Sequence, residues 1–210
     1  MSQRTLSLIL AGLAVLAVLF WFLFGRATPI TNIDSTGTDI IAFGDSLIEG
    51  VGATEGMALP DQLSQKLGHP VINAGIAGET TRDGLARIDE VLEGTNPRII
   101  FLSLGGNDFL KKIPRDETKQ NLGRLIDKMQ ARGAIVVLLG VRSGIIGGGF
   151  DDEFEALAEQ HGTLYVEDIL SGIFGDSRSM SDPVHPNDRG YGIIADRIVE
   201  TLSDHDIRVR

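Results

Sequence analysis

The chain has 210 residues, of which 42% are hydrophobic and 26 are glycine, so it can bury one sizeable core and is expected to form a single domain. It contains no cysteine, which excludes disulfides, cysteine-ligated metals and thiol nucleophiles. A formal net charge of −10 disfavours nucleic acid as a partner.

Residues 6–24 form an unbroken stretch without a charged side chain. As a helix it would be roughly 28 Å long, close to the thickness of a bilayer core. Arg4 and Arg26 flank the stretch, and Trp21 lies near its far end, where an indole favours the membrane interface. We therefore predict an N-terminal transmembrane anchor over residues 1–26.

The free α-amino group favours a cytoplasmic start of the chain, so the remaining domain is expected to be extracytoplasmic. The alternative is a cleaved signal peptide. Its apolar region would be unusually long, however, and the only candidate cleavage triplet has Arg26 in its middle. An uncleaved anchor is therefore favoured over a signal peptide.

Residues 27–38 lack hydrophobic periodicity and are rich in small polar residues, which predicts a linker. The folded domain is expected over residues 39–205. Five apolar runs within this domain predict strands at residues 40–43, 71–72, 99–104, 134–139 and 164–166.

Helical spacing of apolar residues separates the later strands. One such stripe ends before Gly133, another ends before Gly162, and a third begins at Tyr191 and reaches Leu202. The alternation of strands and helices predicts a parallel sheet covered on both faces.

Ser46 ends a Gly-Asp-Ser turn that follows the first predicted strand, and open α/β sheets bind ligands at such strand ends. Asp182 and His185 lie three residues apart on a loop before the last helix. A serine hydroxyl is a weak nucleophile unless a base takes its proton, and an imidazole held by a carboxylate is the usual base. These three residues predict a Ser-His-Asp catalytic set. Taken alone, Ser46 could equally be a helix N-cap, and Asp45 is expected to brace the turn through backbone N–H groups.

Four blocks stand in order along the domain: Gly-Asp-Ser-Leu at residues 44–47, Gly78 within residues 73–81, Gly-Gly-Asn-Asp at residues 105–108, and Asp-Pro-Val-His at residues 182–185. Together they resemble the Ser, Gly, Asn and His blocks of the SGNH (GDSL) hydrolase family.

Within that family the chain is most similar to the bacterial arylesterase, thioesterase and lysophospholipase branch, through Gly-Leu-Ala-Arg at residues 84–87 and His-Pro-Asn at residues 185–187. The resemblance implies a flavodoxin-like, three-layer α/β/α fold with a five-stranded parallel sheet. It also implies hydrolysis of carboxylic ester or thioester bonds.

The resemblance further implies an oxyanion hole formed by the backbone N–H groups of Ser46 and Gly78 and the side-chain amide of Asn107. Each of the last two has another interpretation, because Gly78 could merely permit a positive φ and Asn107 could belong to a strand-end turn. Gly75 competes with Gly78 for the same role, and only the Gly-Glu-Thr context of the family's second block favours Gly78.

No metal or cofactor is expected. The four histidines are scattered at positions 69, 161, 185 and 205, without a close set of carboxylate ligands around them. The glycine-rich residues 144–149 lack the spacing of a phosphate-binding loop, so they are interpreted as a loop on the substrate side.

The expected protein is therefore a membrane-anchored serine esterase that acts through an acyl-enzyme, and the resemblance implies aryl esters, short-to-medium acyl esters, acyl thioesters and lysophospholipids as its substrates. Its expected partners are a small-molecule or lipid ester and the membrane around the N-terminal helix, with no nucleic acid. Removal of acetyl groups from polysaccharide or cell wall is an alternative activity, and a non-catalytic anchored binding domain is an alternative of another class.

Overall fold

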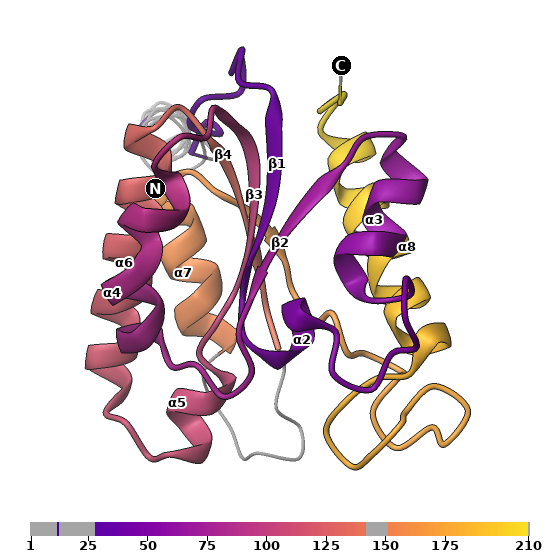
Figure 1. Cartoon of the computed structure of the whole chain (residues 1–210). Coiled ribbons are helices and arrows are strands. Elements are labelled where there is room, and N and C mark those ends of the chain that lie inside the picture. The colour runs from indigo at the N-terminus through magenta and orange to yellow at the C-terminus, as the bar shows by residue number, and fades with distance from the viewer. Residues whose placement is uncertain (1–11, 13–27, 142–150, 210) are drawn as a thin grey trace, which may run out of the picture.

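A five-stranded parallel sheet forms the centre of the molecule, with strand order β2-β1-β3-β4-β5 (Figure 1). The computed structural model describes residue 12, residues 28–141 and residues 151–209. The five predicted strands and their parallel arrangement are confirmed. Their bounds are β1 Asp39–Gly44, β2 Val71–Gly75, β3 Pro97–Ser103, β4 Ile135–Leu139 and β5 Leu164–Val166.

Helices cover both faces of this sheet. The helices are α2 Ser46–Glu49, α3 Leu59–Leu67, α4 Thr81–Leu92, α5 Gly106–Leu110, α6 Arg115–Ala131, α7 Asp151–His161 and α8 Asp188–Asp204. Figure 1 shows α4, α6 and α7 on one side of the sheet and α3 and α8 on the other. This is the predicted three-layer arrangement, with the strand order of flavodoxin-like folds.

The apolar run of β1 explains why the sheet is buried on both sides. Successive side chains of a strand point to opposite faces. Ile40 and Ala42 pack into one core cluster with α3 and α8, whereas Ile41 and Phe43 pack into the other with α4, α6 and α7. All four are fully buried, so neither face of this strand could carry a polar residue.

The predicted helical stripes are also confirmed. The α6 stripe from Leu122 to Met129 is buried, and the turn after the helix contains Gly133 at a φ of 86°. On α8, the stripe that begins at Tyr191 and reaches Leu202 faces the core.

The register of the three strands at this side of the sheet sets the position of the loops that follow them. Gly44 at the end of β1 is paired with Gly75 of β2 and with Ser103 of β3, so all three strands end level. The chain places β2 on one side of β1 and β3 on the other. This reversal is the switch point at which open α/β sheets form a ligand crevice.

The prediction of a membrane-spanning helix requires correction. Among the described residues, no helix is both long and apolar enough to cross a membrane. The longest described helices, α6 and α8, have 17 residues each, with polar and charged side chains opposite the buried stripe. Residues 6–24, on which the prediction rested, lie outside the described residues except for Gly12. The membrane-anchored location and the membrane as partner are therefore not supported.

Segments at both ends of the predicted domain contact its core. In the segment predicted as a linker, the Asn32 side-chain amide donates to the carbonyl oxygens of Gln130 and Ala134, and the backbone N–H of Thr31 donates to Gly162. Beyond residue 205, Ile207 is buried in the α3–α8 cluster. Packing therefore extends past both predicted boundaries.

The buried stripe of α8 supplies a test of this packing. Ile198 is fully buried, so Ile198→Ala should lower the free energy of unfolding by about 2 to 5 kcal/mol through lost burial and the cavity that remains. Glu200→Ala on the exposed side of the same helix should change it by less than about 0.5 kcal/mol. Urea unfolding followed by circular dichroism measures both values, and equal effects would contradict the assigned face of α8.

Candidate active site

Ser46 is the first residue of α2, directly after the turn that ends β1. Asp45 caps this helix: its Oδ1 accepts a hydrogen bond from the backbone N–H of Leu47 at 3.1 Å. The backbone N–H of Asp45 donates to the Ser103 carbonyl of β3. The prediction that Asp45 braces the turn is confirmed, and the turn presents the Ser46 side chain at the carboxyl edge of the sheet.

The Asp45 carboxyl group is almost completely buried. Its burial raises its pKa to about 6, although the hydrogen bond from Leu47 and the nearby His185 act in the opposite direction. A titratable group thus lies next to Ser46, inside the protein.

His185 joins Ser46 to Asp182. Its Nε2 lies 3.1 Å from the Ser46 Oγ, and its Nδ1 lies 2.7 Å from the Asp182 Oδ2. The other carboxylate oxygen of Asp182 accepts from the backbone N–H groups of Val184 and His185, both at 2.8 Å. The bond from His185, with these backbone donors, lowers the pKa of Asp182 to about 2, so this carboxylate is ionised at neutral pH.

The start of α8 holds the histidine loop in place. Asn187 caps α8 by accepting from the backbone N–H groups of Arg189 and Gly190, and its amide donates to the carbonyl oxygens of Arg178 and Met180. These four hydrogen bonds fix the segment that directly follows His185.

The loop after Ser46 is tied to the same helix. The backbone N–H and hydroxyl of Thr54 donate to the two carboxylate oxygens of Asp188, and the Tyr191 hydroxyl donates to the Val51 carbonyl at 2.7 Å. Gln62 of α3 donates to the backbone carbonyl of Asp188. The serine and histidine loops, far apart in the sequence, are thus held by one helix end.

Gly78 and Gly75 have different surroundings. Gly78 lies in the exposed loop after β2, with a φ of 80°, a conformation that favours glycine. Gly75 ends β2, and its backbone N–H donates to the Asn73 side-chain oxygen at 3.0 Å. A Cβ at Gly75 would lie 2.1 Å from the backbone nitrogen of Glu49, so this glycine permits the close approach of β2 and α2.

Asn107 lies in the first turn of α5, across the switch point from Ser46. Its side-chain nitrogen donates to the Glu79 backbone carbonyl at 2.9 Å and to the Asp45 Oδ2 at 3.2 Å. The amide group therefore links the loops that follow β1, β2 and β3.

A cleft of about 300 Å³ connects these groups. Ser46, Gly78, Asn107 and His185 all line it. The other lining side chains are mostly apolar and include Val51, Leu110, Val141, Leu170, Phe174 and Val184. Residues 142–150, which include the glycine-rich loop predicted at residues 144–149, lie outside the described residues.

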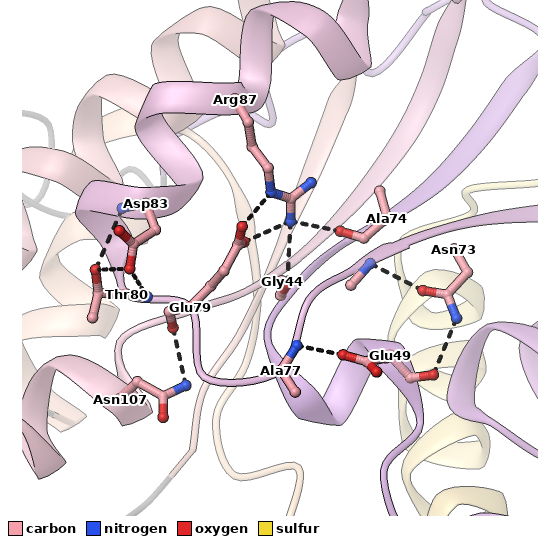
Figure 2. A network of polar contacts seen from close by, with 11 residues as sticks. Gly44, Glu49, Asn73, Ala74, Ala77, Glu79, Thr80, Asp83, Arg87 and Asn107 are labelled. Carbon is pink, nitrogen blue, oxygen red and sulfur yellow. Dashed lines mark hydrogen bonds and ion pairs between the residues drawn. The ribbon is translucent and has the colours of Figure 1, made fainter.

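Sequence reasoning missed the polar network behind the Gly78 loop, which Figure 2 shows. Arg87 of α4 forms an ion pair with Glu79, and its guanidinium also donates to the backbone carbonyl of Ala74. Glu49 accepts from the backbone N–H of Ala77. Glu79 and Arg87 both belong to the stretches that carry the family resemblance, and this membership was the one sequence signal that could have indicated them. Their spacing in the sequence does not show that they form a pair.

The described residues contain no group of three or more histidine, aspartate or glutamate side chains arranged to hold a metal ion. The other three histidines do not line the cleft. His161, for example, contacts the Asp127 carboxylate through Nδ1 at 2.9 Å.

Comparison with known proteins identifies the chain's relatives. The model of the GDSL-like Lipase/Acylhydrolase family matches residues 42–193. Esterase TesA from Pseudomonas aeruginosa (strain PAO1) is 31% identical over 158 residues, which cover 70% of this chain and 79% of that protein. Thioesterase 1/protease 1/lysophospholipase L1 from Escherichia coli (strain K12) is 29% identical over 178 residues, covering 80% and 86%.

Solved structures agree with these relatives. The crystal structure of the psychrotrophic esterase EstA from Pseudoalteromonas sp. has a TM-score of 0.72 and 26% identity, covering 80% of this chain and 98% of that one. The family match extends over most of the described domain and includes the Ser46 turn, the Gly78 loop, Asn107 and His185. The chain therefore belongs to the GDSL-like lipase/acylhydrolase family, and it is an ester hydrolase of the GDSL type.

Proposed function

We propose that the chain hydrolyses carboxylic ester or thioester bonds through a Ser46-His185-Asp182 triad and an acyl-enzyme. The observation that carries this proposal is the continuous contact from the Ser46 hydroxyl through the His185 ring to the Asp182 carboxylate, beside a cleft of about 300 Å³. A hydroxyl, an imidazole and a carboxylate in this order form an activated nucleophile.

In the proposed reaction, the Ser46 Oγ attacks the substrate carbonyl carbon while His185 Nε2 takes the hydroxyl proton. Asp182, ionised at neutral pH, accepts a hydrogen bond from Nδ1–H and so keeps Nε2 free to act as the base. His185 then gives the proton to the leaving alcohol or thiol. A water molecule then attacks the acyl carbon while the same imidazole takes its proton. The bond from the acyl carbon to the Ser46 Oγ breaks, the imidazole returns the proton to this oxygen, and the acid leaves.

The negative oxygen of the tetrahedral intermediate would receive hydrogen bonds from the backbone N–H groups of Ser46 and Gly78 and from the Asn107 amide. The N–H of Ser46 belongs to the first turn of α2, where backbone N–H groups have no intrahelical acceptor. Gly78 is favoured over Gly75 because the Gly75 N–H already donates to Asn73. The Asn107 amide would exchange its longer contact, with Asp45, for the substrate oxygen.

The cleft favours an apolar acyl or aryl group. Most of its lining side chains are apolar, and Leu110 and Val184 at this cleft remain 60% and 46% exposed. Its volume is at the small end of the range for ligand sites, about 300 to 1,000 Å³. We therefore propose aryl esters, short-to-medium acyl esters and thioesters, and lysophospholipids as substrates, in agreement with the names of the relatives. A sugar acetate would leave this apolar lining largely unused.

Replacing the nucleophile is the first test. Ser46→Ala should keep the fold and lower kcat on a soluble aryl ester by about 10⁴ to 10⁶, the range found when a triad residue is removed. A fluorophosphonate probe should label the wild-type protein at Ser46 and should not label this variant. Undiminished hydrolysis by Ser46→Ala would reject the proposed mechanism.

The Asn107 amide provides the second test. Asn107→Ala should lower kcat by about 10² to 10³ if the amide binds the oxyanion, with a much smaller change in KM, because this contact strengthens in the transition state. Steady-state kinetics on the same ester measure both constants. A fall in kcat of less than about threefold would mean that Asn107 serves only in the strand-end turn and does not bind the oxyanion.

The pH profile provides the third test. A general base acts only in its unprotonated form, so kcat/KM should rise from acid towards neutral pH. Asp45, with a pKa raised to about 6, titrates nearby. In Asp45→Asn the rise should persist, because the imidazole is the base. If kcat/KM of Asp45→Asn no longer rose with pH in a pH-stat assay, the pH dependence of the wild type would be assigned to Asp45 instead.

The same carboxyl group makes a prediction for stability. Because its pKa is higher in the folded protein than the ordinary value of 3.8, the folded state binds this proton more tightly. Its contribution to the free energy of unfolding is therefore fully present below the ordinary pKa and is lost as the pH rises through about 6. Between about pH 4.5 and about pH 7.5 the free energy of unfolding should therefore fall more for the wild type than for Asp45→Asn, and urea unfolding of both proteins measures the two changes. Equal changes in the two proteins would contradict the raised pKa.

A further inference from the structure

The loop after β2 has little apolar packing to fix its conformation. Residues 76–78 are exposed, and no atom lies within 4 Å of the position that a Cβ on Gly78 would take. Polar contacts must therefore define where this loop lies. Their geometry matters for the reaction, because the proposed oxyanion donor Gly78 sits in this loop.

We infer that the Glu79–Arg87 ion pair is a positioning device that holds the Gly78 N–H and the Asn107 amide in place for the oxyanion. This inference rests on the proposed function. Neither residue lines the cleft, so both would act through other groups rather than on the substrate itself.

Arg87 is anchored on several sides. Its Nε and Nη2 donate to the two carboxylate oxygens of Glu79 at 2.6 and 2.7 Å, a bidentate geometry. Nη2 also donates to the Ala74 carbonyl at 2.8 Å, and the guanidinium lies 4.2 Å from the centre of the Phe43 ring. Figure 2 shows this arginine reaching from α4 to the end of β2 and to the loop that follows it.

Glu79 passes this constraint to both proposed oxyanion donors. It directly follows Gly78 in the chain, so its position limits where the Gly78 carbonyl and Cα lie, and the Gly78 N–H is bonded to that Cα. Its backbone carbonyl accepts the hydrogen bond from Asn107 Nδ2 at 2.9 Å. A displaced Glu79 would therefore move the Gly78 N–H and release the Asn107 amide at the same time.

The burial of the pair also favours positioning over stability as its role. The Glu79 and Arg87 side chains are only 10% and 17% exposed. In such surroundings the cost of removing two charges from water offsets much of their attraction, so the pair adds little net stability. What a bidentate contact does supply is a defined relative orientation of its two partners.

Two other charged groups hold the same loop from outside. Glu49 accepts from the backbone N–H of Ala77, and Lys111 donates to the Gly78 carbonyl at 2.8 Å. Both contacts are exposed, so water competes with them more strongly than with the Glu79–Arg87 pair. The ion pair is thus the least solvated of the charged contacts at this loop.

The decisive variants replace Arg87. Arg87→Met keeps much of the aliphatic length and removes every donor, and it should lower kcat by about 10- to 100-fold with less than about a threefold change in KM. Arg87→Lys restores the charge without the bidentate geometry and should recover part of the loss. Arg82→Met, on the same helix, removes an exposed ion pair with Glu117 and should change kcat by less than about twofold.

Values of kcat are expressed per active site, counted by end-point titration with a fluorophosphonate probe, so that a partly unfolded sample does not imitate a positioning effect. Thermal unfolding followed by circular dichroism checks the fold of each variant. If Arg87→Met does not fold, Glu79→Gln removes the same ion pair from the other side. Unchanged kcat per site in Arg87→Met, or in Glu79→Gln if Arg87→Met does not fold, would overturn the inference.

A double-mutant cycle with Asn107→Ala tests the route of the effect. If Arg87 acts through the oxyanion donors, the effect of Arg87→Met should be at least about threefold smaller when Asn107 is already absent. Strictly multiplicative losses would mean that Arg87 acts independently of Asn107 and would overturn the inference. A wild-type protein that the probe does not label at Ser46 would instead refute the proposed function itself, so the two failures are distinguishable.

Discussion

The level ending of three parallel strands is the constraint on which the rest of the site depends. Gly44, Gly75 and Ser103 occupy one row of the sheet, so the loops that begin there start at the same height. Ser46, Gly78 and Asn107 each lie only a few residues beyond that row, and short loops leave their backbone little freedom. A sheet buried on both faces cannot shift its register without exposing apolar side chains and burying nothing in return. The hydrophobic core therefore fixes where the three loops begin, and polar contacts then define where the loop after β2 lies.

The fourth loop, which carries Asp182 and His185, does not begin in that row and has to be placed by other means. The capped start of α8 supplies this placement. Asn187 fixes the chain just after the histidine, whereas Asp188 and Tyr191 bind the loop that follows the serine. The separation of serine and imidazole thus depends on contacts at one helix end, 139 residues along the chain from Ser46 to His185. Because α8 also packs its apolar stripe into the core, this helix connects the stability of the domain to the geometry of the site.

Much of this organisation could be predicted from the sequence. The strand positions follow from apolar runs such as residues 40–43, and the position of the serine turn follows from Gly-Asp-Ser at the end of such a run. The Asp45 cap is a local interaction between neighbours, which sequence can reveal. The contacts between distant segments could not be predicted. Nothing in the spacing of Glu79 and Arg87 requires their contact, since it depends on how α4 sits against the sheet.

The N-terminal prediction rests on the apolar length of residues 6–24, which is a property of composition. It is not supported, because no helix among the described residues is long and apolar enough to cross a membrane. The linker prediction used the same kind of signal. The small polar residues of this segment predict a linker, and Asn32 among them also donates through its side chain to two backbone carbonyl groups of the domain. A side-chain amide can satisfy buried carbonyl groups at a distance, and composition does not reveal such pairing.

The two hydrogen bonds that Asp182 accepts from its own loop have a further consequence. Because Val184 and His185 donate from their backbone to the same carboxylate that binds the imidazole, residues 182–185 form a self-contained unit. Its internal geometry does not rely on the sheet. A small displacement of this unit as a whole would change the distance from imidazole to serine while leaving the imidazole-carboxylate contact intact. Variation in neighbouring loops can therefore change the distance from the imidazole to the serine without altering the orientation of the imidazole on the carboxylate. Substitutions within residues 182–185 would change both properties together.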